Sequence, residues 1–203
     1  ALSRTLREEG IKPTEHILNR YSEINLSQWK LLELGKLTRE EVLVRRYEIL
    51  FQEVGMSCDA KKISEKYEDF LGEGHYFIPG AKELLEDLSK KYHLYLASNG
   101  AVKVQMSRIQ SAGIEKYLEK IFLSEQIGYE KPSPQFFEKC FAQIPDFKKE
   151  EALILGDSLT SDIRGGKNAG ILTVWFHPSG KKVEEEIVPD YEIGKLEELK
   201  TIL

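Results

Sequence analysis

The sequence predicts an α/β protein in which a doubly wound parallel sheet accompanies an all-α helical bundle. Two observations predict the two parts. Apolar residues recur at helical spacing throughout the first third of the chain, and short apolar runs alternate with helical segments beyond it. A third observation separates them: the stretch LGEGHYFIPGA at residues 71–81 has two glycines within three residues and a proline, which is typical of a linker or hinge.

The helical bundle is expected over roughly residues 12–71. Gly35 and Gly55 end two of its apolar-periodic runs, as glycine commonly does just beyond a helix. Thr38, followed three residues later by Glu41, has the pattern of a capping box. Asp59 has the position of an N-cap before the next run. No strand-like alternation interrupts this region, so we expect it to be purely helical.

The rest of the chain alternates between helices and strands. Because the strands are continuously apolar, we expect helices to cover both faces of a parallel sheet. The expected helices are 82–91, 102–112, 134–143, 162–169 and a last one after residue 193, and the expected strands are 94–98, 121–124, 152–156, 171–176 and 191–193.

Composition and charge exclude several classes of protein. The 203 residues suffice for one domain, or for a core with a modest insertion. A net charge of −5, with basic and acidic residues intermixed, argues against nucleic acid or an anionic membrane as a partner. No apolar run approaches the ~20 residues that span a bilayer, and no signal-peptide region opens the chain. Cys58 and Cys140 have no nearby cysteine, so free thiols in a reducing compartment, the cytoplasm, are expected.

Polar residues follow three of the predicted strands. In a parallel sheet the carboxyl ends of the strands meet at one edge, where ligands bind. Each group alone is also compatible with a turn, a helix cap or a surface lysine. Together, a hydroxyl with free N–H groups, a lysine and two carboxylates favour a phosphate held with Mg²⁺. The candidate residues are Ser98, Asn99, Gly100, Lys131, Asp157 and Asp162.

Two competing motifs fail on one residue each. GDSLT lacks the second glycine of a nucleophile elbow, because Thr160 stands in its place. RGGKNAG lacks the hydroxyl residue that must follow the lysine of a P-loop, because Asn168 is there. The sequence therefore favours a phosphoryl-transfer site in which a lysine and Mg²⁺ hold the phosphate, rather than a nucleophile elbow or a P-loop.

Three of these stretches together resemble the motifs of a known superfamily. LYLASNG resembles the second motif of the haloacid dehalogenase superfamily of phosphatases, EKPSP around Lys131 its third, and ILGDSLTSD its fourth. The resemblance covers roughly residues 76–203, and the helical part looks like the cap of subfamily I members. The small pyrimidine 5′-nucleotidase-like phosphatases are the most similar branch. The resemblance implies a helical cap domain at 1–75 and a Rossmann-like α/β core domain at 76–203.

The same resemblance implies a function. We expect a Mg²⁺-dependent phosphatase that hydrolyses small phosphate monoesters, such as nucleoside 5′-monophosphates, through an aspartyl-phosphate. Asp157 would hold the metal, and Asp162 would bind it through water or orient Lys131. Ser98 and the N–H groups of Asn99 and Gly100 would grip the phosphoryl oxygens. The partner would be a small phosphorylated metabolite, and the protein would be a monomer or a weak homodimer.

One motif of the superfamily is missing. The first motif, D-x-D-x-T/V, carries the aspartate nucleophile, and no DxD occurs in the sequence. Because the chain starts with Ala1 rather than methionine, we expect a strand with this motif to precede residue 1. Two alternatives stay open at this point. One is a metal-independent 2-haloacid dehalogenase on the same scaffold, and the other is a non-catalytic phosphate- or nucleotide-binding relative that lacks the nucleophile.

Overall fold

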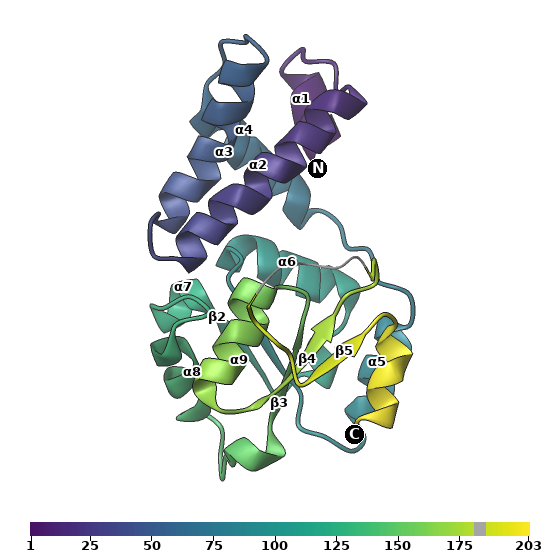
Figure 1. The fold of residues 1–203 in the computed structure, drawn as a ribbon. Coiled ribbons are helices and arrows are strands. Elements are labelled where there is room, and N and C mark those ends of the chain that lie inside the picture. Colours follow the sequence, from purple (N-terminus) through teal and green to yellow (C-terminus); the bar gives the residue numbers. More distant parts are fainter. Residues whose placement is uncertain (181–185) are drawn as a thin grey trace. The chain divides into compact units, whose positions relative to one another are not determined.

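The computed structural model describes residues 1–180 and 186–203 (Figure 1). The chain divides into two compact units. One consists of Ala1–His75 and Lys103–Ser111, and the other of Tyr76–Val102 and Ala112–Leu203. Residues 103–111 therefore group with the helical unit in space, although they follow residue 76 in the chain.

The helical unit contains four helices from the first third of the chain, where the sequence predicts a bundle over 12–71. The helices are α1 (Leu2–Glu8), α2 (Glu15–Glu33), α3 (Arg39–Glu53) and α4 (Ala60–Gly72). Helix α1 was not predicted. The Thr38 capping box is confirmed, with the Thr38 hydroxyl accepting from the Glu41 N–H and the Glu41 carboxylate accepting from the Thr38 N–H. Asp59 is confirmed as the N-cap of α4.

A tyrosine cluster forms the centre of this unit. The rings of Tyr21 and Tyr47 lie 5.3 Å apart, and their hydroxyls are 3.2 Å apart. The Arg46 guanidinium lies over both rings and is only 4% exposed. It donates to Asn25 Oδ1 at 3.0 Å and to Glu68 Oε1 at 2.9 Å, so its buried charge is paired. Burial raises the pKa of both tyrosine hydroxyls, which therefore stay neutral.

The second unit alternates between helices and strands, as the sequence predicts. The expected helix 134–143 is shorter, and the expected helix 162–169 begins as a π-helical segment, Leu159–Ile163. A short helix at residues 124–127 was not predicted. Helix α6 (Val102–Ala112) follows β1 in the chain, but its residues 103–111 belong to the helical unit. The elements of the second unit are α5 (Ala81–Leu88), β1 (Tyr95–Ser98), β2 (Lys120–Leu123), α7 (Ser124–Ile127), α8 (Pro134–Phe141), β3 (Leu153–Gly156), α9 (Arg164–Ala169), β4 (Leu172–Phe176), β5 (Tyr191–Ile193) and a last 3-10 segment, Leu196–Thr201.

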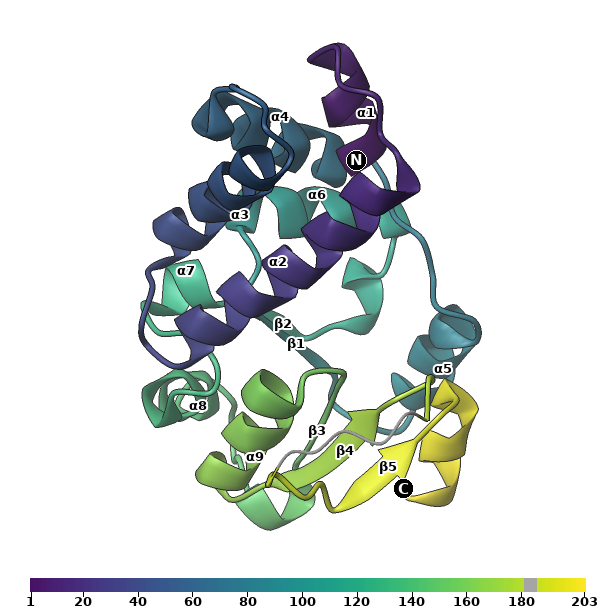
Figure 2. The same cartoon turned by 45° about the horizontal axis from the view of Figure 1, so that its top comes forward.

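Within residues 1–180 and 186–203, all strand pairs are parallel and form two sheets (Figure 2). Strand β1 pairs with β2, while β3, β4 and β5 pair in that order. Among the described residues, no strand pairs with the second edge of β1 or of β3. All four residues of β1 and all four of β3 are only half-buried, whereas four of the five residues of β4 are buried. Two largely apolar strands thus keep a hydrogen-bonding edge open.

Apolar clusters cover both faces of the sheets. The α5 residue Leu84 packs with Val174, Phe176 and the C-terminal segment on one face. Residues of α8 and α9 pack with Phe122 on the other. Helix α9 approaches closely because its second and third residues are glycines. A Cβ at Gly165 would lie 2.5 Å from the Phe137 ring, and one at Gly166 would lie 2.5 Å from Ile154 Cγ2.

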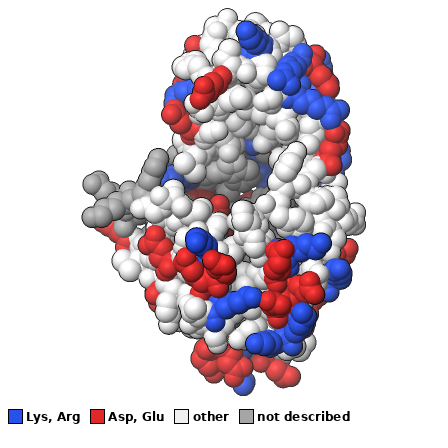
Figure 3. All heavy atoms as spheres, turned by 90° about the vertical axis from the view of Figure 1, so that its right-hand side faces the viewer, with Lys and Arg blue, Asp and Glu red and all other residues white. Residues whose placement is uncertain are grey.

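The surface carries both signs of charge. Figure 3 shows lysine and arginine side chains interspersed with aspartate and glutamate on the face in view. In the part of the chain that the structure describes, every helix is too short or too polar to traverse a bilayer.

Candidate active site

The predicted site residues come from three loops of the second unit, and Lys131 brings these loops together. Lys131 lies between α7 and α8 and is only 7% exposed. Its ammonium group donates to the Ala97 carbonyl at 2.8 Å, near the end of β1. It also donates to Asp162 Oδ1 at 2.5 Å, in the π-helical segment after β3. The lysine therefore links the end of β1 to the segment that follows β3.

The side chain of Asn99 holds the Lys131 loop in place. Its Oδ1 accepts from the Lys131 backbone N–H at 2.9 Å, and its Nδ2 donates to the Lys131 carbonyl at 2.9 Å. The oxygen and the nitrogen of the Asn99 amide thus both bind the backbone of Lys131. The sequence predicts a role only for the backbone N–H of Asn99, so this positioning by its side chain is an addition from the structure.

Asp162 is a buried carboxylate with protein donors on both oxygens. Oδ1 accepts from Lys131, and Oδ2 accepts from the Ser158 backbone N–H at 3.1 Å. Gly156 leaves room for it, because a Cβ at that position would overlap Asp162. The sequence allows two roles for Asp162, a metal ligand through water or a partner that orients Lys131. The bond to Lys131 is the contact that the second role requires.

Asp157 differs from Asp162 in its exposure. It follows β3 directly, and its side chain is exposed. Among the described residues, no donor contacts its carboxylate. Its backbone carbonyl accepts from the Trp175 indole N–H at 3.0 Å. Asp157 therefore has a fixed backbone and an available carboxylate.

The Ser98–Gly100 loop contains an internal hydrogen bond. The Ser98 hydroxyl accepts from the Gly100 N–H at 3.0 Å, so one of the predicted phosphate donors is engaged within the loop. At the start of α6 the Val102 N–H donates to Glu125 Oε2 at 2.9 Å. A carboxylate is favoured there, because the first N–H groups of a helix have no partner within the helix. Sequence reasoning missed Glu125, which is the second residue after β2 and belongs to α7.

A divalent cation fits this arrangement through oxygen ligands. Mg²⁺ is usually held by one or two protein carboxylates, with waters and substrate oxygens completing the octahedron. Asp157 supplies one such carboxylate. The residues that the structure describes contain no cluster of three or more His, Cys, Asp or Glu side chains able to hold a metal. An oxygen donor such as the Asp157 carboxylate suits Mg²⁺, whereas structural zinc sites are built from Cys and His ligands.

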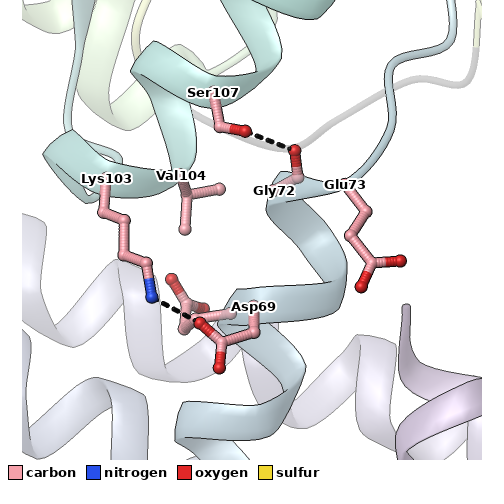
Figure 4. Close-up of a pocket in the computed structure, with 7 residues that line it drawn as sticks. Asp69, Gly72, Glu73, Lys103, Val104 and Ser107 are labelled. Atoms are coloured by element: carbon pink, nitrogen blue, oxygen red, sulfur yellow. Dashed lines mark hydrogen bonds and ion pairs between the residues drawn. The ribbon is translucent and has the colours of Figure 1, made fainter.

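A pocket of about 110 Å³ lies elsewhere, within the helical unit (Figure 4). Lys103 pairs with Asp69 across it at 2.5 Å, and the Ser107 hydroxyl donates to the Gly72 carbonyl at 2.8 Å. None of the predicted site residues lines it. The lining residues are Glu68, Asp69, Gly72, Glu73, Lys103, Val104 and Ser107.

Comparison with known proteins finds a matching family and relatives that span nearly the whole chain. The family model of the haloacid dehalogenase-like hydrolases matches residues 7–176. The HAD-hydrolase YfnB of Bacillus subtilis is 40% identical over 203 residues, which cover 100% of this chain and 86% of YfnB. The pyrimidine 5′-nucleotidase PynA of Streptococcus pneumoniae is 36% identical over 200 residues, covering 98% of this chain and 84% of PynA.

Solved structures show the same relationship. A structure of YfnB bound to magnesium, which reveals interdomain movement, matches with a TM-score of 0.95, 40% identity, and coverage of 100% of this chain and 89% of that chain. A 2-haloacid dehalogenase from Pseudomonas syringae matches with a TM-score of 0.63 at 24% identity, covering 100% of this chain and 87% of that chain. At that identity the likeness concerns the fold alone.

Proposed function

Because the chain belongs to the haloacid dehalogenase-like hydrolases, we propose that it is a Mg²⁺-dependent phosphatase acting on small phosphate monoesters. One observation carries the proposal: the buried ammonium group of Lys131 is held between the end of β1 and Asp162. The available carboxylate of Asp157 follows strand β3, and Asp162 lies five residues further along the chain. A fixed cation, together with an oxygen ligand for a metal, suits a bound phosphoryl group.

Lys131 is suited to hold a phosphoryl oxygen. An ammonium group has three N–H donors. Two of them serve Ala97 and Asp162, and no other described residue is bonded to the third. In the proposed mechanism this donor contacts the phosphoryl group and offsets the charge that develops on it. Ser98 and the backbone N–H groups of its loop would hold the other phosphoryl oxygens.

Asp157 would hold the cation, and Asp162 would keep Lys131 in place. Bound Mg²⁺ supplies charge neutralisation, so that an anionic nucleophile can approach an anionic phosphate. The two carboxylates then have separate tasks. Asp157 remains available to an oxygen-seeking metal, while both oxygens of Asp162 stay with protein donors.

The nucleophile is proposed to come from a further strand of the complete gene product. The open edges of β1 and β3 support this, since a parallel strand could pair with both. An aspartate on it would attack phosphorus, and the ester oxygen would leave as the alcohol after taking up a proton. Water would then hydrolyse the aspartyl-phosphate and release inorganic phosphate. The helical unit would act as a cap that excludes water during these steps.

The similarity to PynA supports a finer proposal, that nucleoside 5′-monophosphates are substrates. The dehalogenase alternative is less favoured. Because that reaction needs no metal, it leaves the available carboxylate of Asp157 without a role. The non-catalytic alternative depends only on whether the nucleophile is present.

The test uses the complete gene product with p-nitrophenyl phosphate and with nucleoside 5′-monophosphates. We expect Mg²⁺-dependent phosphate release that stops in EDTA. Replacing one preorganised group should slow turnover by about a hundredfold or more, so Lys131→Ala and Asp157→Ala should each lose most activity. Lys148→Ala and Asp87→Ala, which remove exposed surface charges, are the matched controls and should retain it.

Near-wild-type rates in both site variants would refute the proposed roles. Phosphate release that survives EDTA would refute the metal dependence. Halide release from a 2-haloacid in EDTA, without phosphatase activity, would establish the dehalogenase alternative instead.

A further inference from the structure

The peptide group that joins Asp157 to Ser158 is held at both of its polar atoms. The Asp157 carbonyl accepts from Trp175 Nε1 at 3.0 Å. The Ser158 N–H donates to Asp162 Oδ2 at 3.1 Å. Because a peptide unit is planar and nearly rigid, these two bonds fix the orientation of the whole plane. This restraint applies to the backbone next to the exposed carboxylate of Asp157.

Trp175 reaches this carbonyl from the neighbouring strand. The parallel ladder between β3 and β4 ends with the pair Gly156 and Trp175, so Asp157 lies one residue beyond the last pair. The indole N–H thus provides a donor where the backbone ladder stops. The indole is 8% exposed and packs against Leu159 and Ile163, which follow Asp157 in the chain.

His177 keeps the indole ring in position. The two rings are stacked, with centroids 3.9 Å apart and planes at 15°. The imidazole is itself restrained at both nitrogens, by Glu192 Oε1 at 3.0 Å from Nδ1 and by the Ser179 hydroxyl at 2.7 Å from Nε2. The chain of contacts therefore runs from β5 through His177 and Trp175 to the backbone of Asp157.

We propose that Trp175 is a positioning residue that sets the direction of the Asp157 carboxylate toward a divalent cation, an inference that rests on the proposed function. Mg²⁺ requires near-ideal octahedral geometry, and a site loses function when its groups deviate by about 0.5 Å or 10–20°. If the peptide plane between Asp157 and Ser158 could rotate, the direction of the Asp157 carboxylate would vary by more than these limits. Trp175 and Asp162 prevent this rotation from the two sides.

The direct test is Trp175→Phe in the complete gene product, with Mg²⁺ affinity measured by isothermal titration calorimetry. Phenylalanine keeps an aromatic ring beside His177 but lacks the indole N–H. Losing one hydrogen bond that supports the site should weaken Mg²⁺ binding by about 3- to 10-fold. The melting temperature of the metal-free protein should change little, and the phosphatase rate should recover as Mg²⁺ is raised.

The chain offers a matched control. Trp29 in α2 also donates an indole hydrogen bond, to Asn25 Oδ1 at 3.1 Å, but it lies in the helical unit. Trp29→Phe should leave the Mg²⁺ affinity unchanged. If Trp175→Phe does not fold, His177→Leu tests the same inference, because it removes the stacked ring while keeping the indole N–H. Like Trp175→Phe, it should weaken Mg²⁺ binding.

The outcomes separate this inference from the proposed function. Wild-type protein that binds Mg²⁺, with Trp175→Phe binding it equally well, would overturn the role of Trp175 and leave the phosphatase proposal standing. Equal loss of affinity in Trp29→Phe would also overturn it. Wild-type protein that binds no Mg²⁺ would overturn both.

Discussion

Replacing Gly156 with alanine tests whether the position of Asp162 organises the site. Gly156 is the last residue of β3, and a Cβ there would overlap the Cβ, Cγ and Oδ2 atoms of Asp162. Ordinary carbon contacts are about 3.5–4.0 Å, so Asp162 would have to move by roughly 1 Å. That shift would lengthen its bonds to Lys131 and to the Ser158 N–H, which are 2.5 and 3.1 Å.

The expected loss of stability has two parts. Overpacking of this kind costs about 1–3 kcal/mol. Separating a buried ion pair adds to that, and removing one partner entirely costs about 3–5 kcal/mol. Because Asp162 would be displaced rather than removed, we expect about 3 kcal/mol in total, or a melting temperature about 6–12 °C lower for a chain of this length. Phosphatase turnover should also fall, because Lys131 would lose its fixed position.

The measurement is a thermal denaturation curve together with phosphatase kinetics well below the transition. Gly166→Ala is a matched control, because its Cβ would lie 2.5 Å from Ile154 Cγ2 and 2.7 Å from Thr173 Cγ2, both apolar core atoms. It should destabilise the fold while leaving turnover largely intact. Gly194→Ala, with open space around the new methyl group, should change neither property. A Gly156→Ala protein with unchanged melting temperature and turnover would refute the reasoning.

Two further predictions concern ionisable groups outside the site. The Lys167 ammonium group, together with Thr173, lowers the pKa of Asp190 below its usual value near 3.9. The charged carboxylate therefore stabilises the fold above about pH 4 and loses this effect as the pH falls through its lowered pKa. Asp190→Asn should lower the melting temperature at pH 7, with a difference from wild type that shrinks toward pH 3; a constant difference would contradict this. Burial raises the pKa of the Cys140 thiol to about 12, so at pH 8 iodoacetamide should modify the half-buried Cys58 first, as peptide mass spectrometry would show. Equal labelling of the two thiols in the native protein would be the contrary result.

The local part of the fold could be predicted from the sequence. Helix caps at Thr38 and Asp59 depend on residues three positions apart, so a stretch of four residues contains the whole pattern. The parallel strands could be recognised because both of their faces are apolar. Helix α1 could not, since its seven residues are too few for a clear period.

The candidate residues, too, could be named from the sequence, since polar groups at the ends of buried strands are conspicuous. Their contacts and their exposure could not be predicted in this way. Asp157 and Asp162 look equivalent in the chain, yet one carboxylate is exposed and available while the other is buried between Lys131 and Ser158. The amide of Asn99 and the indole of Trp175 gave no signal, because each acts on a backbone group far away in sequence.

What the sequence determined by itself is the class of fold and which polar residues follow its strands, because secondary structure and residue type are local properties. What the tertiary structure decided is which of these groups form hydrogen bonds with one another. Hydrogen bonds between residues 18 to 34 positions apart, from Trp175 to Asp157 and from Lys131 to Asp162, Asn99 and Ala97, arise only when strands distant in the chain are packed side by side.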